Sequence, residues 1–236
     1  MVAEDSGPPD PASTRDRIIA TALRLFEERG YERTTMRAVA TEAGVSLGST
    51  YYYFASKEHL IQGFYERIQH LHHDASQEAL RSGRDPVDRI AGVALAWLDV
   101  AEPYHQFAGA FFRVAADPSS PLSPFSEASA PARDAAVDLY REALAGSRLR
   151  LGAEFAEHLP RLLWLAHMGL VLFWVHDASP GQRRSRLLVR RAVPLVVRLA
   201  AASRLAPLRP LVREVAELLD VVGLPGDPTG TRPGDR

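Results

Sequence analysis

Residues 30–60 read GYERTTMRAVATEAGVSLGSTYYYFASKEHL and carry the most informative pattern in this chain of 236 residues. Apolar residues recur at helical spacing over 35–43, Gly44 ends that short helix, and a second helix is expected over about 46–54. Ala40 is small where the two helices must approach closely, and Gly44 tolerates the left-handed backbone of a tight turn. The pattern therefore predicts a helix-turn-helix, whose second helix can lie in a DNA major groove.

Helical periodicity continues on both sides of this motif, and no segment alternates convincingly at the period of a strand. A first helix is expected from Ser13 to Gly30, and Ser56 is expected to cap a long helix. Asp85 followed by Pro86 is typical of another helix start. After a short helix of aromatic residues and a loop, further helices are predicted at about 131–145, 154–177, 182–203 and 208–222. We predict an all-α fold of about ten helices.

The chain divides into four predicted segments. Residues 1–12 and 223–236 are rich in Pro, Gly and polar residues, so both are expected to be disordered tails. Residues 13–58 are expected to form a helix-turn-helix domain of three helices. Residues 59–222 are expected to form a larger helical domain.

Composition excludes several classes of protein. The 28 Lys and Arg residues balance 29 Asp and Glu, so a globally basic nucleic-acid binder is excluded while a local basic surface is not. The absence of Cys excludes disulfides, thiolate metal sites and cysteine nucleophiles. The nearly apolar run 162–175 is shorter than the roughly 18 residues of a membrane span, and residues 1–17 lack an apolar signal core. We expect a cytoplasmic chain without a membrane partner.

Residues 13–60 resemble the amino-terminal domain of the TetR/AcrR family of transcriptional repressors. The rest of the chain is similar to that family only in length, helical content and architecture. The matching residues are Gly30, Tyr31, Thr34, Thr35, Ala40, Gly44, Val45, Ser46, Gly48, Tyr51, Phe54, Ser56, Lys57 and Glu58. The resemblance implies a sequence-specific DNA-binding regulator, and most directly a repressor that a small-molecule effector releases from a palindromic operator. An activator or a helical ligand-binding protein of the same family is the alternative.

The resemblance also implies which residues contact double-stranded DNA. Thr35 and Lys57 correspond to phosphate clamps, and Tyr51 and Tyr52 to further phosphate contacts. The complete predicted set is Thr35, Arg37, Ser46, Leu47, Gly48, Ser49, Tyr51, Tyr52, Tyr53 and Lys57. Base reading falls to Leu47, Ser49 and Tyr53, of which Leu47 can make only apolar contact. Thr50 departs from the family pattern, because an apolar residue usually packs there.

Two other interpretations apply to the same stretch. Tyr51, Tyr52 and Tyr53 could be core residues, but three consecutive helical residues span about 200° and cannot all be buried. The run 44–48 (GVSLG) matches the serine-hydrolase elbow, which needs a strand before the serine where helical spacing is found here. No Gly-rich phosphate loop or obvious pair of catalytic carboxylates is present, so we do not expect an enzyme.

The larger domain is expected to dimerise and to bind the effector. The helix near 161–176 is apolar on every side, and 182–203 has one apolar and one Arg-rich face. Because the family dimer is a four-helix bundle of two such helices per subunit, we predict interface residues Leu172, Trp174, Val189, Val193 and Val196. Aromatic residues suggest a pocket for an apolar or aromatic effector, lined by Trp97, Phe107, Phe111, Trp164, His167 and Met168. Core packing is the alternative for each of them.

No cofactor or metal is predicted. His72 and His73 point about 100° apart and cannot share a helical face, whereas His70 could bind a metal together with His73 or Asp74. We favour the interpretation of His70, His72, His73 and Asp74 as a solvated face. Residues 181–213 hold nine Arg and no acidic residue. They form either a site for a second anionic partner or, as we favour, a solvated face partly neutralised by acidic helices.

Overall fold

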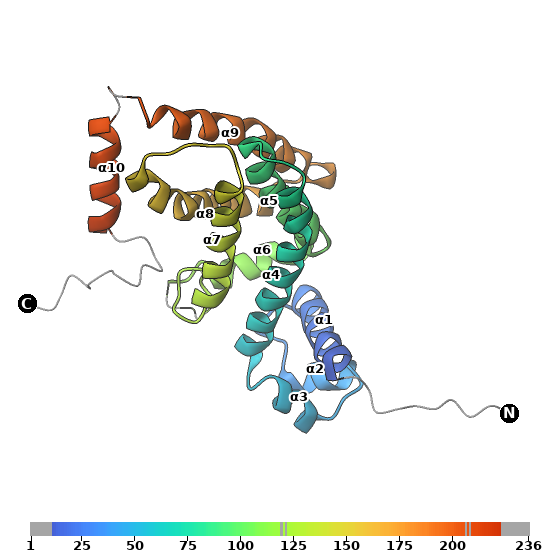
Figure 1. Ribbon diagram of the computed structural model, residues 1–236. Helices are drawn as coiled ribbons and strands as arrows, with labels where there is room; N and C mark the ends of the chain where they lie inside the picture. The colour runs from blue at the N-terminus through green and yellow to red at the C-terminus, as the bar shows by residue number, and fades with distance from the viewer. Residues whose placement is uncertain (1–10, 119, 121, 206, 208, 223–236) are drawn as a thin grey trace, which may run out of the picture. The chain divides into compact units, whose positions relative to one another are not determined.

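The computed structural model describes residues 11–118, 120, 122–205, 207 and 209–222. These residues form helices and no strand, which confirms the all-α prediction (Figure 1). The elements are α1 (Pro11–Arg29), α2 (Met36–Glu42), α3 (Leu47–Tyr53), α4 (Lys57–Arg81), α5 (Pro86–Ala101), α6 (His105–Ala115), α7 (Ala130–Ala145), α8 (Ala153–Val175), α9 (Arg183–Ala202) and α10 (Arg209–Val222), with 3-10 helices at Glu102–Tyr104 and Pro180–Gln182. Helix α1 begins at Pro11, inside the predicted tail 1–12. The predicted tail 223–236 and residues 1–10 lie outside the described residues.

The chain forms two compact units that are not contiguous in sequence. Unit 1 comprises the chain up to Arg67 together with Tyr104–Ser123, and unit 2 comprises Ile68–Pro103 and the chain from Pro124 onward. Helix α4 therefore contributes its first turns to unit 1 and the remainder to unit 2. The predicted division at residue 58 differs, because α6 belongs to unit 1 and packs against α1.

Unit 1 is built around the apolar face of α1. Ile18, Ile19, Leu25 and Phe26 are fully buried there, and each stabilises the fold by about 1.5–3 kcal/mol through loss of apolar surface from water. Phe111 of α6 packs edge-on against Tyr65 of α4 at 5.1 Å between ring centroids. The Tyr65 hydroxyl donates to the carbonyl of Leu122 at 2.9 Å. These contacts hold the 104–123 segment in unit 1, although it follows the first 67 residues at long sequence separation.

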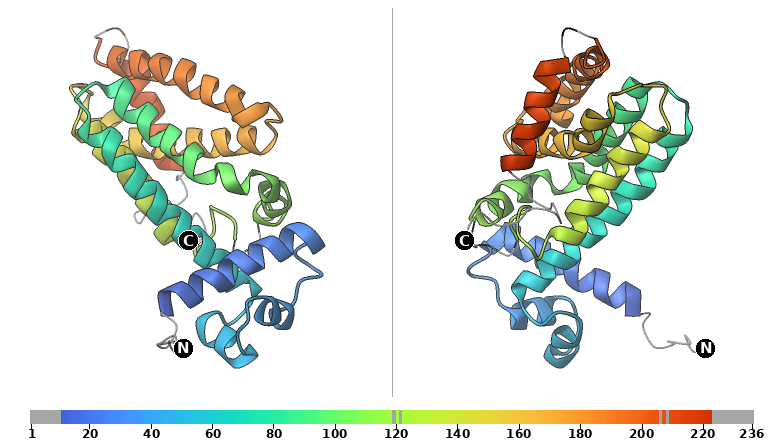
Figure 2. Two further views of the ribbon diagram at one scale, coloured as in Figure 1. Left: turned by 90° about the vertical axis from the view of Figure 1, so that its right-hand side faces the viewer. Right: turned by 60° about the vertical axis from the view of Figure 1, so that its left-hand side comes forward.

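In unit 2, α7 and α9 pack against α5, and α9 lies along α8 (Figure 2). Helix α5 starts as the sequence predicts, because the Asp85 carboxylate accepts from the backbone N–H groups of Val87 and Asp88 at 2.9 and 3.4 Å, with Pro86 in the first turn. One turn further on, Arg89 is buried without a carboxylate partner among the described residues.

The Arg89 guanidinium instead donates to carbonyl oxygens at the ends of two helices. Its Nε binds Ala143 O at 2.9 Å and Nη2 binds Glu142 O at 3.0 Å, both in the last turn of α7. Its Nη1 binds Leu80 O at the end of α4 and the following Gly83 O. Helix carboxyl ends carry partial negative charge and unsatisfied carbonyls, so one cation satisfies both ends at once. A Cβ on Gly146 would lie 2.1 Å from Arg89 Nη2, which explains glycine there.

A second buried charge joins α8 to α9. The Asp177 carboxylate accepts from the backbone N–H and hydroxyl of Ser179, at 3.0 and 2.6 Å. It also accepts from the backbone N–H and hydroxyl of Ser185, both at 2.8 Å. Hydrogen bonds from these two serines hold the pKa of Asp177 well below its ordinary value despite burial. Since Gln182 before α9 has φ 45° and provides no side-chain cap, Asp177 caps this helix from outside it.

Helix α8 extends the apolar run singled out in the sequence by nine residues at its amino end. Within it, the 21-residue segment Phe155–Val175 has a mean hydropathy of 1.3 and could cross a membrane by length and composition alone. In the most apolar 18-residue stretch of this segment, 39% is buried inside the protein. Helix α8 packs against α7, α9 and α10. Helices in the core of soluble proteins meet the same criterion, so this finding is weak evidence for a membrane span.

We expect Arg89→Met to destabilise the protein by about 3–5 kcal/mol, because the buried carbonyls of α4 and α7 lose their donors. The matched control is Arg84→Met, which removes an exposed guanidinium close by and should change stability by less than about 0.5 kcal/mol. Urea unfolding followed by circular dichroism measures both changes. Equal stability of the two variants would contradict the role of Arg89.

Candidate nucleic-acid interface

The α2–α3 hairpin forms the predicted helix-turn-helix. The Thr35 hydroxyl caps α2 by accepting from Ala38 N at 3.2 Å, and the Ser46 hydroxyl caps α3 by accepting from Ser49 N at 2.9 Å. Between the helices, Gly44 has φ 65°, a left-handed conformation that favours glycine. Both caps and the turn come from short local patterns, which is why the sequence predicts them.

The caps also decide against the serine-hydrolase interpretation of 44–48. Ser46 follows a helix and a turn rather than a strand, and its hydroxyl is used to cap α3. A nucleophile elbow requires a strand before the serine.

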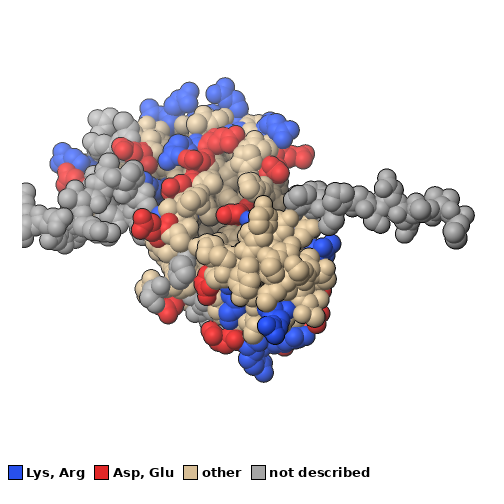
Figure 3. All heavy atoms as spheres, turned by 90° about the horizontal axis from the view of Figure 1, so that it is seen from below, with Lys and Arg blue, Asp and Glu red and all other residues tan. Residues whose placement is uncertain are grey.

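Helix α3 presents an uncharged face. Tyr52 and Tyr51 are 84% and 51% exposed, and Gly48 and Ser46 are also exposed. Leu47, Ser49 and Tyr53 are half-buried. Figure 3 views this side of unit 1 and shows a broad area without charge, bordered by both basic and acidic side chains. Tyr51 and Tyr52 are therefore not core residues.

Thr50, the departure from the family pattern, is accommodated on the inner side of α3. It is completely buried, and its hydroxyl donates to Ser46 O at 3.2 Å. The buried polar atom is therefore satisfied within its own helix. Threonine at position 50 therefore packs on the inner side of α3 without an unsatisfied polar atom.

Lys57, the only lysine of the chain, begins α4 and is already positioned. Its Nζ donates to Tyr31 O at 3.0 Å and lies 4.3 Å from the centroid of the Tyr31 ring. The Tyr31 hydroxyl donates in turn to Glu58 at 2.8 Å, and burial together with this carboxylate raises the Tyr31 pKa. An ammonium group has three donors, so Lys57 keeps two for a phosphate. Arg37 of α2 is exposed.

The predicted effector residues are distributed over both units. Trp97, Trp164, His167 and Met168 belong to unit 2, whereas Phe111 belongs to unit 1. The side chain of Phe107 lies outside those that the structure describes.

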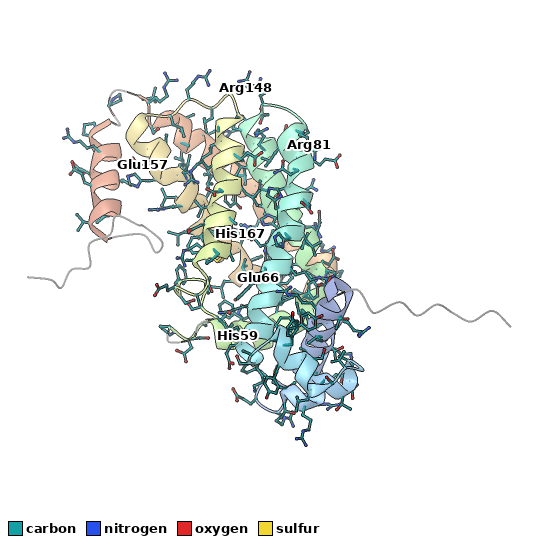
Figure 4. All side chains as sticks on the ribbon, turned by 60° about the horizontal axis from the view of Figure 1, so that its bottom comes forward. His59, Glu66, Arg81, Arg148, Glu157 and His167 are labelled. Atoms are coloured by element: carbon teal, nitrogen blue, oxygen red, sulfur yellow. The ribbon has the colours of Figure 1, made fainter. Side chains whose placement is uncertain are left out.

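In unit 2, polar and aromatic groups gather around His167 (labelled in Figure 4). Its Nδ1 is 2.8 Å from the Tyr140 hydroxyl, and the Trp97 ring meets it edge-on at 5.1 Å. His72 lies beside it, with 5.8 Å between ring centroids. His72 Nε2 is 2.9 Å from Val93 O, and its Nδ1 is buried without a hydrogen-bond partner. We call His72, His167, Tyr140 and Trp97 the His167 cluster.

His72 is only 1% exposed, so the prediction that it belongs to a solvated face is wrong. The contact of Tyr140 with His167 joins two helices and has no signal in the sequence. Burial lowers the pKa of His72 to about 4 and that of His167 to about 3, so both rings are neutral at pH 7. No group of three or more potential metal ligands occurs among the described residues.

The residues predicted for a dimer interface differ in accessibility. Leu172 is exposed and Val196 half-buried, but Trp174, Val189 and Val193 are buried inside unit 2. The Trp174 ring, for example, meets the Trp97 ring edge-on, with 5.1 Å between ring centroids. Those three cannot meet a partner without repacking. The apolar surface that a partner could reach comprises Leu172, Phe173, Leu188, Leu195 and Leu199, which we call the exposed α8–α9 face.

Family models match two parts of the chain. Residues 18–63 match the model described as bacterial regulatory proteins, tetR family. Residues 89–218, more than half of the chain, match the model described as tetracyclin repressor-like, C-terminal domain.

Individual relatives and structures agree with these matches. The chain is 31% identical over 98 residues to the HTH-type transcriptional repressor KstR2 of Mycolicibacterium smegmatis, covering 42% of this chain and 48% of that protein. It is 34% identical over 77 residues to the HTH-type transcriptional regulator UidR of Escherichia coli, covering 33% and 36%. The chain thus spans about half the length, or less, of these curated relatives. The TetR transcriptional regulator of Nitrosomonas europaea shares the fold, with a TM-score of 0.62, 21% identity, and 77% and 96% of the two chains covered.

The buried histidines predict a pH dependence of stability. Because their folded-state pKa values lie below the ordinary 6.5, the unfolded chain binds more protons below that pH. Their contribution to the free energy of unfolding is complete above about pH 6.5. It is lost as the pH falls toward 4 for His72 and toward 3 for His167, by up to about 1.4 kcal/mol per pH unit for each histidine. Urea unfolding at pH 7, 6 and 5 should therefore show a smaller loss in His72→Gln than in the unmodified protein. His176→Gln, at an exposed position, is the control and should retain the full loss.

Proposed function

Since the chain belongs to the TetR family of bacterial regulatory proteins, we propose that it is a homodimeric transcriptional repressor that a small-molecule effector releases from a palindromic DNA operator. The observation that carries this proposal is the capped α2–α3 hairpin, with α3 exposed along Tyr51, Tyr52 and Gly48. The chain acts in the cytoplasm and performs no catalytic step. Activation in place of repression is decided by where the operator lies relative to the promoter.

DNA is recognised through hydroxyl and backbone groups more than through charge. Helix α3 has no charged residue, so its contacts to phosphate come from Tyr51, Tyr52 and the exposed backbone at Gly48. Lys57 and Thr35 complete the phosphate contacts from the starts of α4 and α2. Leu47 and Ser49, in the first turn of α3, and Tyr53, its last residue, read the bases.

The exposed α8–α9 face is the surface on which a second copy packs. Leu188, Leu195 and Leu199 of α9 fall on one side of the helix, and Leu199 is 73% exposed in the single chain. Together with the exposed Leu172 and Phe173 of α8, they supply the apolar surface that a partner subunit would cover. Two copies are needed because two recognition helices must reach half-sites about 34–36 Å apart, or a multiple of that distance.

The effector binds in unit 2, beside the His167 cluster. Aromatic rings and two neutral imidazoles suit contact with an apolar or aromatic molecule that carries one neutral hydrogen-bonding group. The unpartnered Nδ1 of His72 offers such a group a partner. The effector prefers a conformer in which the two recognition helices no longer match the half-sites, and so weakens operator binding.

Fluorescence anisotropy on the DNA upstream of the chain's own reading frame tests the proposal. The native duplex should bind more tightly than a shuffled duplex of the same composition, at a low and at a near-physiological salt concentration. Equal binding of both duplexes that disappears with salt would reflect phosphate contacts alone and would contradict a specific regulator.

Two variants test the assignment of the phosphate contacts. Lys57→Ala should weaken binding to native and shuffled duplexes by a common factor and reduce the salt slope of log K by about 1. Tyr52→Phe should weaken both equally without changing that slope, because only a neutral hydroxyl is removed. Arg84→Ala in unit 2 is the control and should leave binding unchanged. A change in sequence preference at a single base pair would assign Tyr52 or Lys57 to base reading instead.

The dimer surface is tested on α9. Leu199→Glu should yield a folded monomer in analytical ultracentrifugation at micromolar concentration, since the side chain is exposed in the single chain and covered only by a partner. Leu187→Glu is a matched control, because Leu187 is 54% exposed but lies about 100° around the helix from Leu188. Dimers of unchanged stability in Leu199→Glu would rule out this face.

A further inference from the structure

A groove in unit 2 has no role in the proposed function. It lies where the start of α5, the segment between α7 and α8, the end of α9 and the start of α10 meet, and its volume is about 1180 Å³. That volume exceeds the roughly 300–1,000 Å³ typical of small-molecule sites, so a ligand of many atoms fits. All of its lining residues belong to unit 2. The groove is separate from the His167 cluster, none of whose residues line it.

The walls of the groove are partly apolar. Val87 of α5, Phe155 of α8 and Val197 of α9 line it, and Leu205 follows just after α9. Leu205 is 56% exposed, so its apolar surface is available for contact. Burying a methylene group against such surface contributes about 0.8 kcal/mol. The groove can therefore hold an alkyl chain.

The same walls carry an excess of positive charge. Four arginines line the groove, and Asp85 is the one carboxylate among its described lining residues. Asp85 accepts from Arg148 (labelled in Figure 4) at 2.8 Å and also caps α5, so it is fully engaged. Arg213 forms an ion pair with Glu217, with 3.6 Å between Nε and Oε1.

Arg150 and Arg204 remain without a carboxylate partner among the residues that the structure describes, and both are exposed. Guanidinium groups bind carboxylate and phosphate through two parallel hydrogen bonds. Part of the Arg-rich segment 181–213 thus lines a hollow with apolar walls rather than an evenly solvated helix face.

We propose that this groove binds an anionic amphiphile, a molecule with a medium-length alkyl chain and a carboxylate or phosphate head. The head lies at Arg150 and Arg204, and the chain lies along Phe155, Val197 and Leu205. A neutral alkyl molecule lacks the first contact, and a free inorganic anion lacks the second. The proposal needs no DNA binding, so it stands or falls separately from the proposed function.

Isothermal titration calorimetry on the full chain, without DNA, tests it with octyl phosphate and octanoate. Both should bind saturably, and octan-1-ol and inorganic phosphate should each bind at least about tenfold more weakly than octyl phosphate, because each supplies only half of the contacts. A preference between octyl phosphate and octanoate identifies which head the groove accepts.

Variants at the groove locate the binding. Arg150→Gln with Arg204→Gln should weaken octyl phosphate binding at least about tenfold, since the double variant removes the two unpaired cations. Ala201→Trp should weaken it by obstructing the groove while keeping every charge. The control, Arg183→Gln with Arg190→Gln, removes two exposed α9 cations outside the lining and should leave affinity unchanged.

Three results would overturn the proposal. They are no saturable binding of either anion at millimolar concentration, equal binding of octan-1-ol, and unchanged affinity in the Arg150 and Arg204 double variant. Unchanged affinity there together with loss in a His167→Phe variant would place the ligand at the His167 cluster instead.

Discussion

Unit 2 depends on the buried guanidinium of Arg89, which has carbonyl oxygens in place of a counter-ion. Arg89 meets the carboxyl ends of α4 and α7 from inside α5, so three helices share a single joint. A buried guanidinium is costly unless its donors are satisfied, and here helix-end carbonyls satisfy them. The contacts of Arg89 also require glycine at position 146. The segment that follows Gly146 contains Arg148 and Arg150, which line the groove. The position of the groove thus follows from how two helices end.

Local signals in the sequence were sufficient for most helix boundaries. Thr35, Ser46 and Asp85 cap their helices through hydrogen bonds to residues two or three positions away, and Gly44 has the expected positive φ. Such features are encoded within one turn of chain. The assignment of α6 to unit 1 was not predictable in this way, because it rests on contacts such as Phe111 with Tyr65, 46 positions apart.

The candidate interface was predictable to the extent that exposure follows helix geometry. Tyr51 and Tyr52 are exposed and Thr50 is buried, in agreement with the angular spacing of neighbouring helical residues.

Helix α9, by contrast, has apolar residues both on the face that packs inside unit 2 and on a face that is exposed. Periodicity identifies that apolar surface but not which side packs inward, so Val189 and Val193 turned out buried while Leu195 and Leu199 are exposed. The partner of His167 was equally invisible, because Tyr140 comes from another helix.

The corner between α8 and α9 has a consequence for the order of folding. Asp177 makes its four hydrogen bonds to residues only two and eight positions away. Closing so short a loop costs little chain entropy, and contacts of low sequence separation form fastest. This corner can therefore assemble before the joint around Arg89, whose partners in α7 are more than 50 positions distant. A hairpin of α8 and α9 would then be present early as a nucleus on which α5 and α7 condense.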